Sequence, residues 1–207
     1  PLDSRSDALA RMTDTAQFTD SRIEYFASRA TPLGTQVVHV ADVAAFAVFI
    51  RGAASDAGTS QVWIPPQLNL VAPGLAGALQ TVGIESIEVA DRDSARDQPL
   101  GLSLAARAII ETGSVLLDER TIEDRAPGIM TLHNITVVPM DRVADSLDDA
   151  AGVLRSIALR PGGGYASFVT GPSRTADIEM SLTVGVQGPK QVSVVFVDRV
   201  NDSGVTL

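Results

Sequence analysis

Cysteine is absent from this chain of 207 residues, and that absence excludes several kinds of chemistry. The chain cannot form a disulfide, use a thiol nucleophile or hold an iron-sulfur cluster through its own thiolates. No cofactor is therefore expected to be bound by this chain, and any redox centre would come from a partner protein or a diffusible cofactor. A cysteine-free sequence also agrees with a cytoplasmic location, which we predict.

Positive charge is scarce, with 16 Lys and Arg against 25 Asp and Glu and a formal net charge of -9. No cluster of basic residues interleaved with aromatics occurs, so binding to nucleic acid is not expected. The longest apolar run, Val43 to Ile50, is far shorter than the roughly 20 residues of a membrane span. The opening residues, Pro1 to Arg5, lack the pattern of a signal peptide, and we expect no membrane span.

Histidine is limited to His39 and His133. A catalytic zinc site usually has three protein ligands with His or Cys prominent, so no metal site is predicted. No Gly-x-Ser-x-Gly segment indicates a serine hydrolase. His39 lies within an apolar run and is predicted to be packed, whereas His133 precedes the strand-like run Ile135 to Val138. There an acid-base role, an anion-binding role or a structural role for His133 are all open.

Length and a 45% hydrophobic content indicate one sizeable domain. We expect an N-terminal helical segment, residues 1–34, packed on a single α/β domain, residues 35–207. The helical period predicts two helices, Ser6 to Met12 and Thr19 to Ala30, and Ser21 and Glu24 have capping-box spacing in the second.

From Thr35 onward, short β-like runs alternate with helical patterns, which predicts a mainly parallel sheet with helices on both faces. The charged stretch Asp91 to Gln98 is read as a solvated loop. The predicted helices run from an Asp42 cap to Ile50, over Gly74 to Thr81, and from a Ser146 cap over Leu147 to Leu159. The predicted strands are Thr35–Val40, Ser60–Ile64, Ile84–Val89, Ala108–Ile110, Ser114–Leu117, Ile135–Val138, Tyr165–Thr170 and Val192–Val197.

The segment Gly171-Pro172-Ser173-Arg174-Thr175-Ala176-Asp177-Ile178-Glu179 is unusually polar for a connection. It follows a run that reads as a buried strand, and a helical turn could follow the polar residues. In that context backbone amides and an arginine can hold an anion. The alternative is structural: Thr175 caps a turn, and Arg174 pairs with Asp177 or Glu179.

A second polar segment, Glu111-Thr112-Gly113-Ser114, lies between two β-like runs. A glycine in such a position indicates a bulge or a close approach of another segment, and a neighbouring carboxylate can be directed at a site. The alternative is a hairpin or bulge in which Glu111 faces solvent.

Together, Glu111-Thr112-Gly113-Ser114, His133 with its Val/Ile-rich strand, and Gly171 to Glu179 followed by Gly185, Gly188 and Pro189 resemble the LUD domain family. Within it, the similarity is to the lactate utilization protein C (LutC/YkgG) group. The resemblance extends from about Ile23 to Asp198. The chain departs from the family pattern at Ala106, where relatives often have an acid, and at Ile129-Met130, where they have Leu-Pro.

This resemblance implies a fold of the NagB/RpiA/CoA-transferase-like type. It also implies a part in oxidising L-lactate to pyruvate with iron-sulfur partner proteins, in which this chain would be the member without a cluster.

The residue roles are our own hypothesis. Arg174 would bind a carboxylate or phosphate, Ser173 and Thr175 would donate hydrogen bonds, and Glu111 or His133 would be the acid-base group. Thr112, Gly113, Asp177 and Glu179 complete the predicted ligand-binding set. In an open α/β sheet such groups are expected at the carboxyl ends of the strands. The alternatives are a CoA-transferase-like or sugar-phosphate enzyme and a non-catalytic ligand-sensing domain.

Overall fold

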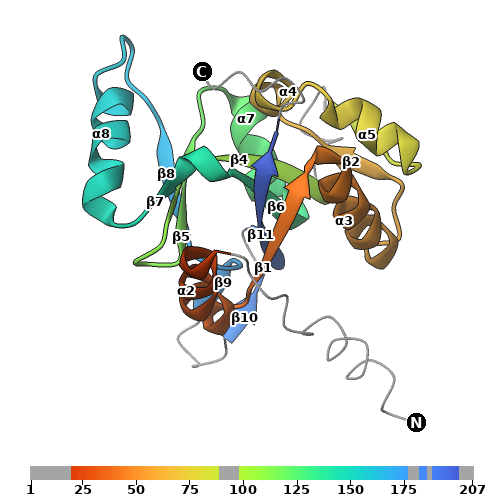
Figure 1. Cartoon of the computed structure of the whole chain (residues 1–207), viewed down its shortest axis with the longest axis horizontal. Helices are drawn as coiled ribbons and strands as arrows, with labels where there is room; N and C mark the ends of the chain where they lie inside the picture. The colour runs from red at the N-terminus through yellow and green to blue at the C-terminus, as the bar shows by residue number, and fades with distance from the viewer. Residues whose placement is uncertain (1–19, 89–97, 177–181, 186–187, 201–207) are drawn as a thin grey trace.

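The computed structural model describes residues 20–88, 98–176, 182–185 and 188–200 (Figure 1). The first half contains α2 (Ser21–Ala30), the 3-10 turn η1 (Thr31–Leu33), β1 (Thr35–Asp42), α3 (Val43–Asp56), β2 (Gln61–Trp63), α4 (Pro66–Val71), α5 (Leu75–Thr81), β3 (Glu85–Ile87) and β4 (Gln98–Ile109). The second half contains β5 (Ser114–Asp118), α7 (Ile122–Met130), β6 (Thr131–Pro139), η2 (Met140–Arg142), β7 (Val143–Ala144), α8 (Leu147–Ala158), β8 (Ala166–Val169), β9 (Arg174–Ala176), β10 (Leu182–Val184) and β11 (Gln191–Arg199).

The main sheet has the strand order β1-β11-β6-β4-β2-β3, and every neighbouring pair along this path is parallel. The C-terminal half of β4 also forms a parallel pair with β7 and an antiparallel pair with β5. The strand β5 in turn pairs with β8. Because β11 lies between β1 and β6, the last described strand is central to the sheet. The predicted mainly parallel α/β architecture is confirmed.

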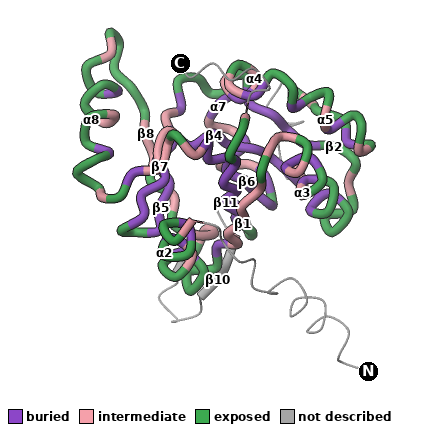
Figure 2. Tube along the Cα trace, in the orientation of Figure 1, coloured by how far each residue is buried: buried purple, intermediate pink, exposed green. Residues whose placement is uncertain are grey.

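Helices cover both faces of this sheet (Figure 1). On one face α3, α4 and α5 pack through Phe46, Leu68 and Leu75 against alternate residues of β4, β6 and β11. On the opposite face α2 packs on β11 and β5, and α7 lies over Gly101 and Ser103 of β4. The helix α8 packs on the hairpin extension formed by β5 and β8. Buried residues accordingly concentrate along the central strands (Figure 2).

The helix α2 is part of the core. Ile23, Phe26 and Ala30 are completely buried, and the ring of Phe26 meets that of Phe196 edge to face with centroids 5.2 Å apart. The helix begins one residue earlier than the predicted capping box requires, because the Asp20 carboxylate accepts from the Arg22 amide at 2.9 Å. The expectation that Ser21 and Glu24 form the cap was therefore wrong. The predicted helix Ser6 to Met12 lies outside the described residues.

Two local signals were confirmed at helix starts. Asp42 accepts from the Ala45 amide at 2.9 Å and caps α3. Ser146 caps α8 and forms a full capping box with Asp149.

Three regions differ from the sequence expectation. Of the run Ala108 to Ile110, the first two residues end the long strand β4, which contains a bulge between Ala105 and Arg107, and Ile110 begins the following turn. The helix α7 was not predicted, because Pro127 and Gly128 are residues that normally end helices. The run before Gly171 was predicted to be a buried strand, but β8 pairs with β5 alone within the described residues, and Phe168 is about half exposed. Of the charged stretch Asp91 to Gln98, only Gln98 is described, at the start of β4.

In the described part of the chain, no helix is both long enough and apolar enough to cross a membrane.

Truncating Phe26 tests whether α2 contributes to the stability of the whole sheet. Phe26→Ala should lower the free energy of unfolding by about 3–5 kcal/mol, because it removes a fully buried ring and leaves a cavity against Phe196. Urea denaturation followed by circular dichroism measures the loss. Tyr25→Ala is the matched control, since Tyr25 is 51% exposed, and its effect should stay below about 1 kcal/mol. Equal effects of the two substitutions would contradict a core role for α2.

Candidate functional site

The turn after β4 rests on the C-terminal end of α2. Arg29 Nε donates to the Glu111 carbonyl oxygen at 3.2 Å. Gly113 has φ +67°, and a Cβ atom there would lie 2.7 Å from Arg29 Cβ and 2.9 Å from the Ala30 nitrogen. Glycine is thus required twice, by the left-handed backbone and by the contact. The predicted close approach at this glycine is confirmed, and the approaching segment is α2.

The segment from Gly171 to Arg174 packs on the residues that follow α2. The Arg174 guanidinium donates to the Leu33 carbonyl oxygen. Gly171 has φ +90°, and a Cβ atom there would lie 2.5 Å from the same oxygen. A direct link joins the two motif segments, since the hydroxyls of Ser114 and Thr170 are 2.7 Å apart. Both segments therefore meet at residues 29–34, which we call the α2 joint.

Ser173 is held mainly by its backbone. Its amide donates to the Pro189 carbonyl oxygen at 3.0 Å, and its own carbonyl accepts from Gly185 at 2.9 Å. A Cβ atom on Gly188 would lie 3.1 Å from Ser173 Cβ. The glycines and the proline of the C-terminal motif thus form the support of Ser173.

The chain beyond Ser173 continues as strand rather than as the helical turn that the sequence suggested. Arg174–Ala176 forms β9, which pairs in antiparallel with β10 and contains Thr175. Asp177 and Glu179 lie outside the described residues.

Glu111 and Thr112 lie in the exposed turn between β4 and β5. The Glu111 carboxylate accepts from the Leu147 amide at 3.2 Å, in the first turn of α8. A carboxylate in this position satisfies a free amide and is stabilised by the helix dipole. Glu111 therefore has a structural contact in addition to the chemical role that the sequence suggested.

His133 is buried near the amino end of β6 and lies on the sheet face covered by α3. Its Nε2 atom is 2.8 Å from the Ser193 hydroxyl, which donates to Gln36 Oε1 at 2.9 Å. Because the Ser193 proton is used in that second bond, His133 Nε2 carries a hydrogen and donates it. Burial lowers the pKa of His133 to about 4, while the charge of Asp56 opposes the shift. His133 is therefore a neutral hydrogen-bond donor at neutral pH.

The predicted site residues do not meet at the carboxyl ends of the strands. His133 pairs with Gln191 and Leu100, in the first residues of β6, β11 and β4. Arg174 and Ser173 contact Leu33 and Pro189, which precede β1 and β11. The expectation of a carboxyl-end site was wrong for these residues, which lie along the amino-terminal edge of β1, β11 and β6.

A buried polar cluster under α7 was missed from the sequence. Glu119 is 3% exposed, and Ser167 donates to its Oε2 atom at 3.0 Å. Burial raises the pKa of the Glu119 carboxyl, and the hydrogen bond from Ser167 opposes the rise. Beside it, Asn134 Nδ2 donates to the Ser103 hydroxyl at 2.9 Å. The available signal was the acidic pair that directly follows the buried strand β5.

Among the ranges that the structure describes, no three His, Asp or Glu side chains are close enough together to share a metal ion.

The shifted pKa of His133 predicts a pH dependence of stability. In the unfolded chain its pKa is near 6.5, so between pH 6.5 and about 4 the unfolded state binds a proton that the folded state does not. The contribution of His133 to the free energy of unfolding should be fully present above pH 6.5 and be lost as the pH falls to about 4. The total loss should be on the order of 3 kcal/mol. Urea titrations of the wild type and of His133→Gln at several pH values isolate this contribution. Stability curves that run parallel over this range would contradict it.

Comparison with known proteins places these segments in a family context. Residues 23–197 match the LUD domain, and this range contains both segments that meet at the α2 joint. Lactate utilization protein C of Geobacillus kaustophilus is 36% identical over 111 residues, which cover 52% of this chain and 46% of that protein. Lactate utilization protein C of Halalkalibacterium halodurans is 28% identical over 148 residues, or 66% of this chain and 61% of that protein. The chain spans about half the length of most of the curated relatives it matches.

The fold has a counterpart among solved structures. A crystal structure of a DUF162 family protein from Deinococcus radiodurans aligns with a TM-score of 0.60 and 22% identity. The alignment covers 86% of this chain and 96% of that chain, so the two share a fold. The sequence match over residues 23–197 goes further: the chain belongs to the LUD domain family.

Proposed function

We propose that this chain supports the oxidation of L-lactate to pyruvate together with iron-sulfur partner proteins, and that it binds a small carboxylate anion beside the α2 joint. Similarity to proteins named lactate utilization protein C supports the metabolic role. The absence of cysteine supports the division of labour, because a cluster in the assembly would be held by another chain. The proposed setting is the cytoplasm.

The observation that carries the anion site is the convergence of two motif segments on residues 29–34. Arg174 is exposed there, and the Leu33 carbonyl accepts from its guanidinium. A guanidinium has five N–H donors, so the bond to Leu33 fixes the position of the group and leaves other N–H groups to donate to a ligand. Arginine is well suited to a carboxylate, which it can bind with two parallel hydrogen bonds.

A second cation lies on the same network. Lys190 is the single lysine of the sequence and is exposed. Its side chain passes over Gly185, where an added Cβ atom would lie 2.1 Å from Lys190 Cγ, and the Gly185 amide is bonded to the Ser173 carbonyl. Within the described residues, no carboxylate forms an ion pair with Arg174 or Lys190. Arg174 and Lys190 are therefore two cations among the described residues that an anion could pair with, although the whole chain is acidic.

The enzyme alternative has less support from the geometry. A CoA-transferase-like or sugar-phosphate enzyme would need an acid at the ligand, for which the sequence suggested Glu111. The Glu111 carboxylate instead accepts from the first turn of α8. A ligand-sensing domain without catalysis shares the proposed anion site but needs no iron-sulfur partner, so partner capture distinguishes it from the main proposal.

Arg174→Ala should weaken the binding of L-lactate or pyruvate about tenfold or more, because a hydrogen bond to a charged group contributes about 1.5–3 kcal/mol. Isothermal titration calorimetry measures the change, and thermal unfolding shows whether the fold persists. Arg155→Ala is the matched control, since Arg155 is an exposed arginine on α8, away from the α2 joint. Arg174→Lys, which keeps the charge but loses the fork, should bind with intermediate strength. If Arg174→Ala and Arg155→Ala bind these anions equally well, the site is not at Arg174.

The partner proposal has its own test. The tagged chain, expressed in lactate-grown cells of its natural host, should retain an iron-sulfur protein that is recognised by its visible absorption and iron content. A tagged acidic protein of similar size serves as the control bait. Recovery of no iron-sulfur protein above that control would reject the proposed assembly, whatever the outcome of the anion titration.

A further inference from the structure

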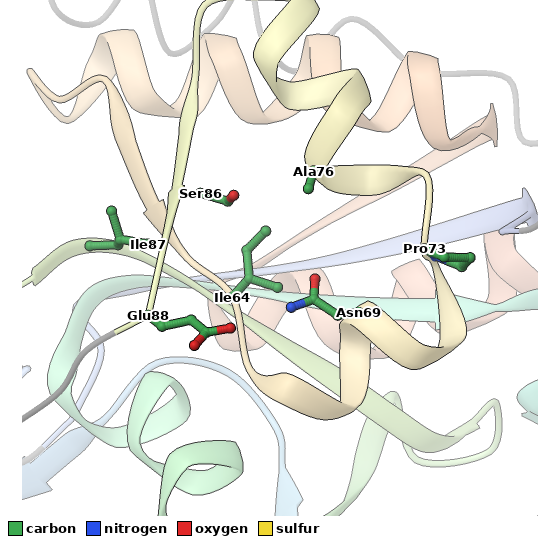
Figure 3. Close-up of a pocket in the computed structure, with 7 residues that line it drawn as sticks. All are labelled: Ile64, Asn69, Pro73, Ala76, Ser86, Ile87 and Glu88. Carbon is green, nitrogen blue, oxygen red and sulfur yellow. The ribbon is translucent and has the colours of Figure 1, made fainter.

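A cavity of about 360 Å³ lies at the opposite edge of the sheet from the α2 joint (Figure 3). Ile64 of its lining directly follows β2, while Ile87 ends β3 and Glu88 follows it. The cavity is therefore at the carboxyl ends of two parallel strands, where ligands bind in open α/β sheets. Its volume falls within the range of about 300–1,000 Å³ that is usual for small-molecule sites.

Three polar side chains from two segments are turned toward this cavity. They are the amide of Asn69 on α4, the hydroxyl of Ser86 on β3 and the carboxylate of Glu88 (Figure 3). None of these three side chains forms a hydrogen bond or an ion pair with another residue in the described part of the chain. Their hydrogen-bonding capacity is thus left to solvent or to a ligand.

The remaining lining is apolar. Ile64 is buried, and Pro73 and Ala76 border the opening on the side of α5, whereas the side chain of Ile87 points to the other side of β3 (Figure 3). Among the described residues of the lining there is no Lys, Arg or His, and Glu88 is the one ionisable group. The negative charge of Glu88 disfavours an anion beside it, in contrast to the cation Arg174 at the proposed anion site.

The three polar groups select for hydroxyls. A carboxylate only accepts hydrogen bonds, whereas an amide and a hydroxyl both donate and accept. An ammonium group only donates, so it could satisfy Glu88 but would leave the donors of Asn69 unused. A hydroxyl donates to a carboxylate and accepts from an amide. Two adjacent hydroxyls can donate to both oxygens of one carboxylate. An acidic side chain near the end of a β-strand binds a ribose hydroxyl in dinucleotide-binding folds by the same contact.

We infer that this cavity binds a ring that carries vicinal hydroxyls, with Glu88 accepting from the diol, Asn69 and Ser86 completing the hydrogen bonds, and Ile64 contacting the apolar face of the ring. A free sugar and the ribose of a nucleoside both supply this chemistry. The inference is independent of the anion site and of any iron-sulfur partner.

Calorimetric titration of the full chain with adenosine, 2′-deoxyadenosine and D-ribose tests the inference. Adenosine should bind about 10- to 100-fold more tightly than 2′-deoxyadenosine, because the deoxy compound lacks one of the two hydroxyls that a charged group accepts from. Binding of adenosine without ribose would identify a nucleoside as the source of the diol, and comparable binding of ribose would identify a sugar. Both results support the site.

Glu88→Gln should weaken binding of the preferred diol about tenfold or more, because it removes the charged acceptor. Glu85→Gln is the matched control: it removes the same charge three residues earlier, at the start of β3, from a residue that accepts from Gln61 and does not line the cavity. Arg174→Ala should leave diol binding unchanged. The inference is overturned if neither adenosine nor ribose binds at millimolar concentration, if 2′-deoxyadenosine binds as well as adenosine, or if Glu88→Gln behaves like Glu85→Gln.

Discussion

The hydrogen-bond ladder that holds β11 between β1 and β6 determines where every motif segment lies. Gln36 and Ser193, which are partners in this ladder, are 157 residues apart in sequence. Bringing such distant segments together costs chain entropy, and burial of every residue from Val192 to Val197 offsets that cost. Alternate residues of the strand serve both layers, since Phe196 meets α2 and Val195 meets the cluster around α3. Both faces of the sheet therefore depend on this strand. The loop before it contains Pro189, whose carbonyl oxygen accepts from the Ser173 amide.

The glycines of the motif segments have a physical explanation in the α2 joint. Gly113 and Gly171 come close to the backbone around Ala30 and Leu33, and both have positive φ. A side chain at either position would have to separate the two segments from the joint. Such a signature therefore specifies a packing arrangement first, and the chemistry of Arg174 depends on that arrangement because the guanidinium contacts the same Leu33 carbonyl.

Local sequence signals predicted the elements whose ends are fixed by neighbouring residues. Asp42 and Ser146 cap helices through contacts three residues away, so those helices were recognisable. The helix α7 was not, because Pro127 and Gly128 suit the tertiary surroundings: Pro127 is buried, and a Cβ atom on Gly128 would lie 3.3 Å from the Ser103 hydroxyl. The motif segments could likewise be found from the sequence, but not the burial of His133 or the contact of Glu111 with α8. Those features arise from pairings between residues far apart in the chain, which no local pattern encodes.

The two edges of the sheet differ in chemistry because different connections fill them. Along the amino-terminal edge, the Leu33 carbonyl of η1 holds Arg174 beside the α2 joint, and Lys190 precedes β11. At the carboxyl ends of β2 and β3 lies a cavity in which Glu88 is the one charged group among the described lining residues. Strands of five or six residues span roughly 17–20 Å, so a ligand at one edge would not touch residues at the other. Any coupling between the two would have to pass through the layer of side chains packed under α3, where the sheet strands share one core. The proposed anion site and the proposed diol site would therefore lie on one domain without direct contact between their ligands.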